Sequence, residues 1–319
     1  MILDGKKLAG EIRERVKQDV TNLNKIGIDV GLALLLAGDN QSSVKYFMAT
    51  LKASEHVGIN VFEYKLPSSA SQNEILNVIR DVNADERISG LLVLFPLPGR
   101  INARGVVNSI LPEKDVDGLG SVSVGRLAAE ESMFQIFSMD ASVPLEGRPY
   151  VHHRSGFIPC MPSSFLPCTP YGVIMLLENY GVEFGGKNVV VIGKSLAVGK
   201  PLAMMFLAKE ATVSICHKST QNLEAYLRNA DIVCSATGVP GLIKGNMIKE
   251  GAIVVDIGIN VRADGSIVGD VDFATVSEKA SMITPVPGGV GPVTIAILLQ
   301  NTVRSAQSNV ILNHPLTIP

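Results

Sequence analysis

A glycine-rich turn between a buried strand and a helix is the strongest local indication of ligand binding in this sequence. The apolar strand ends at Gly193, and a helix begins near Val198 or Gly199. Such a turn directs backbone N–H groups and the positive end of the helix dipole toward a phosphate. The spacing Gly193-x5-Gly199 matches neither the GxGxxG fingerprint nor a Walker loop, so a tight turn without a ligand is the alternative interpretation.

The end of the next strand determines which dinucleotide such a site prefers. An NAD site usually has an Asp or Glu there, about 20 residues further on, to hold the ribose 2′-hydroxyl. This sequence has four residues without a carboxylate instead: His217, Lys218, Ser219 and Thr220. Lys218 and Lys194 suit a 2′-phosphate, although an exposed lysine is often only solvated. We expect NADP as the cofactor, with NAD as the alternative.

Two further strands in this part of the chain also end in glycine. Residues 236–240 include Gly238, and residues 256–260 include Gly258 and Ile259. In open parallel sheets, ligands bind in the crevice outside the carboxyl ends of the strands. Each glycine alone is compatible with an ordinary turn, but successive strand ends of glycine or small polar residues favour a cofactor crevice.

A regular alternation of helices and strands predicts the elements that position this crevice. Apolar residues recur every three or four positions over 6–25, which is the spacing of one buried helical stripe. Short apolar segments then alternate with amphipathic ones, which is typical of βαβ units and parallel sheets. We predict strands over 32–36, 61–64, 90–95, 188–192, 212–216, 232–235 and 252–256, and helices over 42–57, 73–82 and 293–306.

The composition excludes several classes of protein. With 28 Lys and Arg against 30 Asp and Glu, the chain lacks the basic surface of a nucleic-acid-binding protein. The uncharged segment 282–303 is as long as a membrane span, but lipid would not tolerate its prolines and glycines together. The N-terminus has no apolar signal segment, and the four cysteines form no CxxC pair. We expect a cytoplasmic protein that binds neither nucleic acid nor membrane.

Residues 128–164 interrupt the alternation and are rich in proline and glycine, which predicts a long loop or an insertion. This segment contains three potential metal ligands: His152, His153 and Cys160. Adjacent histidines without a second pair of ligands do not have the spacing of a zinc site. We expect no metal.

Several motifs together resemble one known family. They are Asp115-Val116-Asp117-Gly118 with Gly125-Arg126-Leu127, PCTPYGV at 167–173, Gly193-Lys194-Ser195 with Val198-Gly199-Lys200-Pro201, and TPVPGGVGP at 284–292. In these motifs the chain resembles methylenetetrahydrofolate dehydrogenase/methenyltetrahydrofolate cyclohydrolase of the FolD type. The resemblance covers residues 1 to about 305 and excludes the insertion at 128–164.

The resemblance implies two α/β domains that face each other across a cleft. Residues 1–127 with 286–319 would form the folate-binding catalytic domain, to which the last helix returns, and residues 165–285 a Rossmann domain with a parallel sheet. A tetrahydrofolate one-carbon derivative would lie in the cleft, with its methylene carbon beside the nicotinamide. Members of the family usually form homodimers through the Rossmann domains.

The resemblance also implies which residues hold the ligands. Tyr46 would stack on the aminobenzoyl ring of the folate, and Asp117 would hydrogen-bond its pteridine. The rest of the folate pocket would comprise Leu94, Pro96, Pro287, Gly288 and Gly289. The dinucleotide is expected at Thr169, Gly193, Lys194, Ser195, Val198, Gly199, His217, Lys218, Ser219, Thr220, Gly238, Gly258 and Ile259.

Two positions depart from the family pattern. The family has a catalytic lysine four residues after the tyrosine, where this chain has Thr50, and a glutamine that bonds this lysine, where this chain has Leu94. Lys52 cannot simply substitute, because six residues correspond to about 240° around a helix from Tyr46. Loss of both partners is self-consistent, since either one alone would be left unsatisfied at a cost of roughly 1–3 kcal/mol.

These departures separate the two reactions of the family. Hydride transfer mainly needs positioning, whereas hydrolysis of the methenyl cation needs acid-base groups, which usually accelerate a reaction by ~10² to 10⁴. We expect NAD(P)-dependent oxidation of 5,10-methylenetetrahydrofolate at a catalytic site formed by Tyr46, Thr50 and Asp117, with weak or absent cyclohydrolase activity. One alternative is a bifunctional enzyme in which Lys52 or an insertion residue replaces the lysine. The other is a non-catalytic paralogue that binds folate or dinucleotide.

Overall fold

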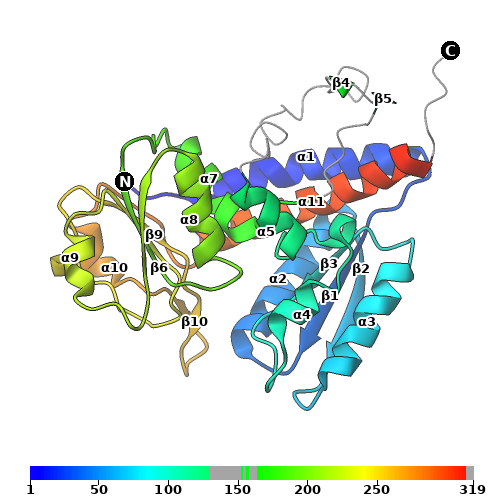
Figure 1. The fold of residues 1–319 in the computed structure, drawn as a ribbon, viewed down its shortest axis with the longest axis horizontal. Helices are drawn as coiled ribbons and strands as arrows, with labels where there is room; N and C mark the ends of the chain where they lie inside the picture. The colour runs from blue at the N-terminus through cyan, green and yellow to red at the C-terminus, as the bar shows by residue number, and fades with distance from the viewer. Residues whose placement is uncertain (130–151, 154–155, 158–163, 314–319) are drawn as a thin grey trace.

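Two parallel β-sheets form the framework of the molecule (Figure 1). The computed structural model describes residues 1–129, 152–153, 156–157 and 164–313. The first sheet has the order β2-β1-β3 and the second the order β12-β9-β8-β6-β7. Their strands are β1 (Gly31–Ala37), β2 (Asn60–Leu66), β3 (Gly90–Val93), β6 (Asn188–Ile192), β7 (Thr212–Cys216), β8 (Ile232–Ser235), β9 (Ile253–Asp256) and β12 (Met282–Ile283). All their pairings are parallel, which confirms the predicted α/β class.

Helices cover both faces of the first sheet. Side chains alternate between the two faces of a strand, so the central strand β1 must be apolar throughout, and all its residues are buried. Leu32 and Leu34 pack in the same cluster as side chains of α1 and α2, whereas Ala33 and Leu35 pack with α3 and α4. These helices are α1 (Gly5–Lys25), α2 (Gln41–Val57), α3 (Gln72–Ala84) and α4 (Ala103–Val107).

The second sheet has the strand order of a dinucleotide-binding fold. The chain leaves β6 for β7 on one side and then returns to β8 on the other, which makes the carboxyl end of β6 a topological switch point. Ligands of open parallel sheets bind at such a point. The helices that accompany this sheet are α7 (Cys168–Asn179), α8 (Gly199–Ala208), α9 (Leu223–Leu227) and α10 (Phe273–Ser277).

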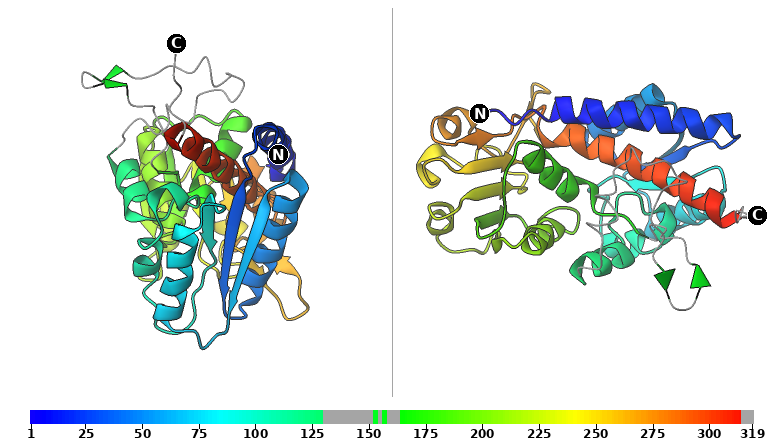
Figure 2. Two further views of the ribbon diagram at one scale, coloured as in Figure 1. Left: turned by 90° about the vertical axis from the view of Figure 1, so that its right-hand side faces the viewer. Right: turned by 90° about the horizontal axis from the view of Figure 1, so that it is seen from above.

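The last helix, α11 (Val290–Asn313), links the two halves of the molecule. It packs along α1 and also against α7, as the view from above in Figure 2 shows. The predicted start at 293 is wrong by one turn, because the helix already begins at Val290 and includes Pro292. A proline is tolerated in the first turn, since the N–H groups there have no hydrogen-bond acceptor within the helix. The helix also extends beyond the predicted end at 306.

Short elements lie outside these layers. They are η1 (Pro112–Lys114), α5 (Ser121–Ala128), the pair β4 (His152–His153) and β5 (Gly156–Phe157), η3 (Gly245–Met247), and the hairpin of β10 (Asn260–Val261) and β11 (Ile267–Val268). Each is too short to show a hydrophobic period in the sequence. Of the predicted insertion at 128–164, the structure describes only residues 128–129, 152–153, 156–157 and 164, so Cys160 lies outside the described residues.

The predicted strands over 188–192, 212–216 and 232–235 are confirmed residue by residue. The predicted strand over 90–95 is too long, since β3 ends at Val93 and Pro96 has no N–H to continue the ladder. The predicted strand over 252–256 begins one residue early. Among the described residues, no helix is long and apolar enough to cross a membrane.

Candidate active site

Helix α2 presents Tyr46 and Thr50 on one face, one helical turn apart. The helix starts at a fixed point because the Asn40 side chain accepts hydrogen bonds from the N–H groups of Ser42 and Ser43, both at 3.1 Å. Thr50 is fully buried, and its hydroxyl donates to the carbonyl oxygen of Tyr46 at 2.9 Å. The hydroxyl is therefore engaged with the backbone of its own helix.

Leu94 and Tyr46 belong to the same hydrophobic cluster. Leu94 is buried, and partly buried Tyr46 packs against the same hydrophobic cluster. The Ser43 hydroxyl donates to the carbonyl oxygen of Phe95 at 2.8 Å, which ties α2 to the segment after β3. Pro96 in this segment and Lys52 on α2 are both exposed. The structure thus places Tyr46 and Thr50 on one face of α2 and Leu94 in the same large hydrophobic cluster as Tyr46. It leaves Lys52 exposed, as the helix geometry predicts.

Asp117 lies in the loop between η1 and α5, where its backbone contacts the start of α7 and its carboxyl is close to Tyr46. Its carbonyl oxygen accepts from the N–H of Cys168 at 3.2 Å. Burial and then the neighbouring charge of Asp115 raise the pKa of the Asp117 carboxyl to about 7. A hydrogen bond from Cys168 acts in the opposite direction and lowers this pKa. Burial and then the charge of Asp117 raise the pKa of Tyr46 well above its ordinary value. The charge of Asp117 therefore acts on the pKa of Tyr46, which places these two candidate ligand-binding side chains near each other.

Asp115 holds the backbone around Asp117 in place. Its carboxylate accepts from Gly120 N–H at 2.8 Å, Leu119 N–H at 3.1 Å and the Ser123 hydroxyl at 2.8 Å. Burial nevertheless raises its pKa to about 6. From the other side, Asn301 of α11 donates to the carbonyl oxygen of Val116 at 2.9 Å. Asp115 and Asn301 are thus structural supports of the candidate folate site.

The segment TPVPGGVGP connects the second sheet to α11. Gly288 has a φ of 116°, and a Cβ added to Gly5 would lie 1.8 Å from the carbonyl oxygen of Gly289, so these backbones touch. Gly5 N–H also donates to the carbonyl oxygen of Gly288 at 3.0 Å. Pro287 is exposed. The contacts of this segment run to the start of α1, and its predicted place in the folate pocket stays a prediction.

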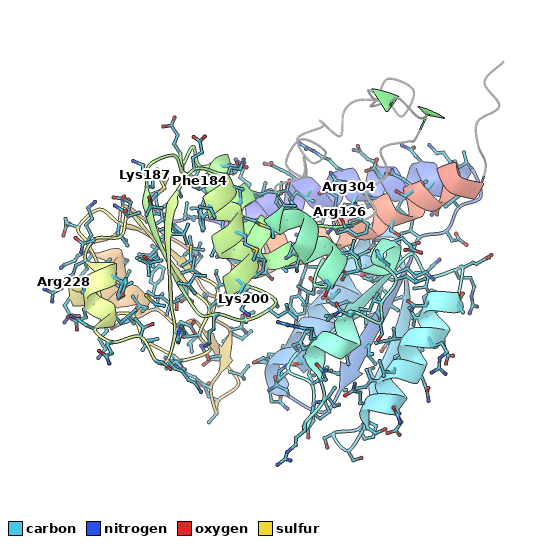
Figure 3. All side chains as sticks on the ribbon, in the orientation of Figure 1. Arg126, Phe184, Lys187, Lys200, Arg228 and Arg304 are labelled. Carbon is cyan, nitrogen blue, oxygen red and sulfur yellow. The ribbon has the colours of Figure 1, made fainter. Side chains whose placement is uncertain are left out.

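The glycine-rich turn after β6 has the close backbone contacts of a ligand cradle. Gly193 has a φ of 119°, and an added Cβ would lie 2.4 Å from the carbonyl oxygen of Ala236. A Cβ on Gly199 would lie 2.0 Å from the carbonyl oxygen of Gly193. The Ser195 hydroxyl accepts from Val198 N–H at 3.1 Å and from Gly199 N–H at 3.3 Å at the start of α8. Figure 3 shows Lys200 at this end of α8, on the side that faces the first sheet.

The turn after β7 lies next to the glycine-rich turn, because Gly193 N–H donates to the carbonyl oxygen of Cys216 at 2.8 Å. The hydroxyl of Thr220 accepts from His217 N–H at 2.8 Å, which closes this turn. Lys194, Lys218 and Ser219 are exposed. Lys194 and Lys218 thus follow the ends of the adjacent strands β6 and β7, and their positive charges suit a 2′-phosphate. Thr169 lies in the first turn of α7, with its hydroxyl 3.4 Å from that of Thr294.

A buried pair of aspartates positions the loops after β8 and β9, and the sequence analysis missed it. Asp270 accepts from Thr237 N–H at 2.6 Å, Gly238 N–H at 3.3 Å and the hydroxyl of Ser235 at 3.1 Å. Its other oxygen accepts from the side-chain amide of Asn260 at 3.0 Å. A Cβ on Gly258 would lie 2.1 Å from this carboxylate. Asp270 therefore holds Gly238 and packs against Gly258, two of the predicted cofactor residues; Ile259 beside them is 41% exposed.

Asp256 supports Asp270 from the end of β9. Its carboxylate accepts from the backbone N–H groups of Gly258, Asp270 and Val271 at 2.9–3.0 Å. Burial raises its pKa to about 6. A Cβ on Gly269 would lie 1.8 Å from the Asp256 carboxylate. The sequence offered one signal, Gly269 directly before Asp270. A single sequence does not show, however, that Asp270 lies beside Asp256.

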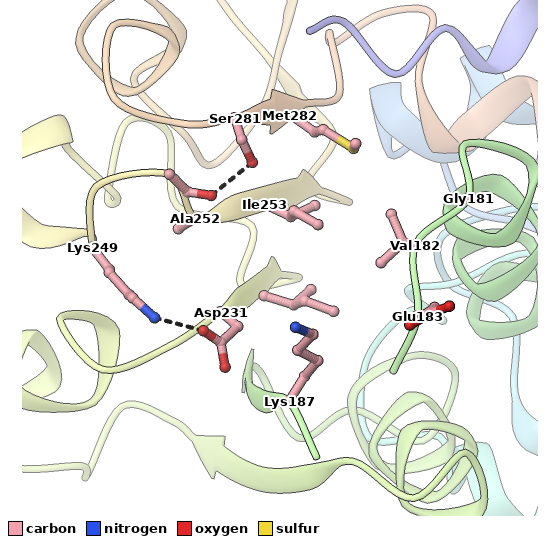
Figure 4. A pocket seen from close by; sticks show the side chains of 12 residues that line it. Gly181, Val182, Glu183, Lys187, Asp231, Lys249, Ala252, Ile253, Ser281 and Met282 are labelled. Atoms are coloured by element: carbon pink, nitrogen blue, oxygen red, sulfur yellow. Dashed lines mark hydrogen bonds and ion pairs between the residues drawn. The ribbon is translucent and has the colours of Figure 1, made fainter. Parts of the chain in front are cut away.

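A cavity of about 340 Å³ lies at the opposite, amino-terminal edge of the second sheet (Figure 4). Lys187 and Asp231 line it, and Lys249 contacts Asp231 at 2.6 Å. Because ligands of open parallel sheets bind at the carboxyl edge, this cavity is not the predicted crevice. Within the described part of the chain, no three His, Cys, Asp or Glu side chains form a group suited to a metal.

Comparison with known proteins agrees with this geometry. The model of the tetrahydrofolate dehydrogenase/cyclohydrolase catalytic domain matches residues 3–117, and that of the NAD(P)-binding domain of the same family matches residues 167–310. The whole of the predicted insertion at 128–164 lies between these two matches.

Full-length relatives show the same similarity. The chain is 44% identical to the bifunctional protein FolD of Moorella thermoacetica over 306 residues, 96% of this chain and 98% of the relative. The structure of a novel 5,10-methylenetetrahydrofolate dehydrogenase from the silkworm Bombyx mori is 37% identical, with a TM-score of 0.80 over 98% of this chain and 99% of that one. The Trypanosoma brucei methylenetetrahydrofolate dehydrogenase-cyclohydrolase complexed with NADP and an inhibitor is 32% identical, with a TM-score of 0.82 over 97% and 98%. The chain therefore belongs to the tetrahydrofolate dehydrogenase/cyclohydrolase family.

Proposed function

We propose that this protein oxidises 5,10-methylenetetrahydrofolate to 5,10-methenyltetrahydrofolate with NADP and that its cyclohydrolase activity is weak or lost. The observation that carries this proposal is the chemistry around Tyr46. Thr50 is buried with its hydroxyl bonded to the Tyr46 carbonyl, and Leu94 is buried and apolar, at the positions of the family lysine and glutamine. Neither residue can move a proton to or from water.

Hydride transfer remains feasible with the residues present. The nicotinamide of NADP supplies the hydride acceptor when it is bound. The backbone packs closely at Gly193 and Gly199, and this turn leads into the N-terminus of α8, where the phosphate of a dinucleotide can bind. Tyr46 would stack on the folate and Asp117 would fix the pteridine, so that the methylene carbon faces the nicotinamide. Loss of hydride leaves a resonance-stabilised cation, and no protein group must transfer a proton in this step.

A bifunctional dehydrogenase/cyclohydrolase is the second candidate, and the names of the relatives favour it. The relative from Moorella thermoacetica at 44% identity is called bifunctional, and the Trypanosoma brucei structure carries both activities in its name. Against these names stand Thr50 and Leu94, and the silkworm relative is named for the dehydrogenase alone. For this candidate, Lys52 or a residue of 128–164 must replace the lysine. A binding paralogue without catalysis is the third candidate.

The proposal includes a domain division and a homodimer. We propose residues 1–127 with 286–319 as the folate domain, 128–164 as an insertion and 165–285 as the dinucleotide domain; the packing of α11 along α1 supports the first of these. Strand β7 is an edge strand of its sheet, with Ile215 43% exposed and Tyr226 beside it 44% exposed. Such an edge suits pairing with a second copy. The three described cysteines are free and buried, which fits a reducing cytoplasm.

Removal of the two lysines is expected to weaken NADP far more than NAD. Each ammonium would form a charge-assisted bond with the 2′-phosphate, so the double variant K194A/K218A should lose at least about tenfold in kcat/KM for NADP. The value for NAD should stay within about twofold, because NAD lacks this phosphate. Steady-state kinetics with each cofactor measures the ratio. Equal losses with both cofactors would contradict the assignment of Lys194 and Lys218.

Folate binding is expected to strengthen as the pH rises through about 7, the pKa of the Asp117 carboxyl. Below this pH the carboxyl is protonated, and above it the carboxylate is a stronger acceptor for the N–H donors of the pteridine. The dissociation constant of tetrahydrofolate, measured by calorimetry, should be about tenfold higher near pH 6 than near pH 8. The variant D117N should bind weakly with a flat profile. An unchanged slope in D117N would assign the titration to another group.

The direct test is reduction of NADP by the purified full-length protein with methylenetetrahydrofolate, followed spectroscopically. Accumulation of the methenyl product together with NADPH supports the proposal. Steady loss of the methenyl product faster than its uncatalysed decay supports the bifunctional candidate. Saturable binding of both ligands without turnover supports the binding paralogue.

A further inference from the structure

A hairpin from the second sheet reaches helix α2 of the first. Strands β10 and β11 form this hairpin, and Asn260 in β10 stands directly after the predicted cofactor residues Gly258 and Ile259. The Lys45 ammonium donates to the carbonyl oxygen of Gly265 at the hairpin tip, and α2 and β10 lie in direct contact. Figure 1 shows the hairpin extending from the second sheet toward α2. Lys45 directly precedes Tyr46 in the sequence.

The hairpin is anchored at its base to the network that holds the cofactor loop. The Asn260 side chain donates to Asp270 at 3.0 Å, and Asp270 accepts from the N–H groups of Thr237 and Gly238. The tip has hydrogen bonds of its own, since Asp264 accepts from both the N–H and the hydroxyl of Ser266 at 2.8 and 2.7 Å. Arg262 N–H donates to the carbonyl oxygen of Ser266 at 2.9 Å. The base of the hairpin and the loop at Gly238 thus share one hydrogen-bond partner, Asp270.

We propose that Lys45 is a positioning residue that clasps the hairpin and so fixes the distance between the folate-binding helix and the cofactor loop. This inference rests on the proposed placement of folate at Tyr46 and of the dinucleotide at Gly238. The two ligands bind to different sheets, so hydride transfer requires the sheets to hold a fixed separation. Lys45 forms this link through its ammonium group. The acceptor is a backbone carbonyl oxygen, which any residue at position 265 would provide.

If the contact between Lys45 and Gly265, here called the clasp, has this role, its loss should affect methylenetetrahydrofolate and NADP differently. In the full-length variant K45M, which keeps the aliphatic part of the side chain, the KM for methylenetetrahydrofolate should rise about tenfold or kcat should fall by a similar factor. The dissociation constant of NADP alone should not change, because Asp270 still holds the loop at Gly238 when Lys45 is replaced. The variant K45R should recover most of the loss, since a guanidinium can also donate to a carbonyl. K25M removes an exposed lysine from α1 and serves as the control, with no change expected.

A second readout does not depend on turnover. Backbone hydrogen exchange over residues 260–268 should be faster in K45M than in the wild type and in K25M, because the tip loses its link to α2. Wild-type kinetics in K45M, or unchanged exchange in the hairpin, would overturn the clasp. Equal weakening of NADP binding would also overturn it, because the effect would then be general misfolding. An inactive wild-type protein with a K45M-dependent hairpin would instead refute the proposed function and leave the clasp standing.

Discussion

The double variant T50K/L94Q is expected to hydrolyse methenyltetrahydrofolate about 10²-fold faster than the wild-type protein. Position 50 lies one helical turn after Tyr46 and is fully buried, and Leu94 is buried in the same region. A lysine there would place an ammonium next to the bound cation, and the glutamine would accept a hydrogen bond from it. Decay of supplied methenyltetrahydrofolate, corrected for the uncatalysed rate, measures the gain.

The single variants are the matched controls. T50K alone places an ammonium beside Leu94 without a partner, and L94Q alone buries an amide without one, at a cost of roughly 1–3 kcal/mol each. Both single variants should therefore be less stable than the double variant in chemical denaturation, and neither should hydrolyse at the rate of the double variant. If the double variant stays folded and oxidises methylenetetrahydrofolate but gains no hydrolysis, Thr50 and Leu94 do not limit the rate of hydrolysis.

Substitution of the buried Asp270 is expected to have the largest effect on the cofactor. The variant D270A removes the acceptor of four hydrogen bonds, from Ser235, Thr237, Gly238 and Asn260. The loop at Gly238 then loses its anchor, so the dissociation constant of NADP should rise at least about tenfold, and the unfolding free energy should fall by roughly 1–3 kcal/mol. Fluorescence titration with NADP and denaturant unfolding measure the two quantities.

Two further variants separate loop positioning from general instability. D270N keeps one acceptor oxygen and should show an intermediate loss of NADP affinity with a smaller loss of stability. D264A removes an exposed aspartate from the tip of the same hairpin and should leave NADP affinity unchanged. If D270A folds and binds NADP as tightly as the wild-type protein, the aspartate network does not position the cofactor loop.

The architecture could be predicted from the sequence because its apolar residues recur with the periods of strands and helices and because family motifs mark both halves of the site. The buried strands over 188–192 and 232–235 contain only apolar residues in their cores, so their limits are visible without a structure. The helix over 6–25 has one apolar stripe, and the structure buries that stripe. The family motifs around Asp117 and Gly193 located both halves of the site, because each motif includes a glycine whose backbone makes a close approach.

The remaining features depend on contacts between residues that are far apart in the chain. Asp270 contacts Ser235 and Asn260, and Lys45 contacts Gly265, but single acidic and basic residues on a sequence have no spacing that identifies their partners. The first turn of α11 was missed because Pro292 looks like a boundary, although a first turn tolerates it. The hairpin of β10 and β11 is too short for a strand pattern.

The rate at which the wild-type protein hydrolyses methenyltetrahydrofolate is the most direct test of the account. The measurement uses purified full-length protein whose oxidation of methylenetetrahydrofolate with NADP has been shown in the same preparation. With Thr50 and Leu94 in place of the lysine and glutamine, we predict decay indistinguishable from the uncatalysed rate. Decay accelerated by ~10²-fold or more would contradict the account, and it would direct the search for the acid-base group to Lys52 and residues 128–164.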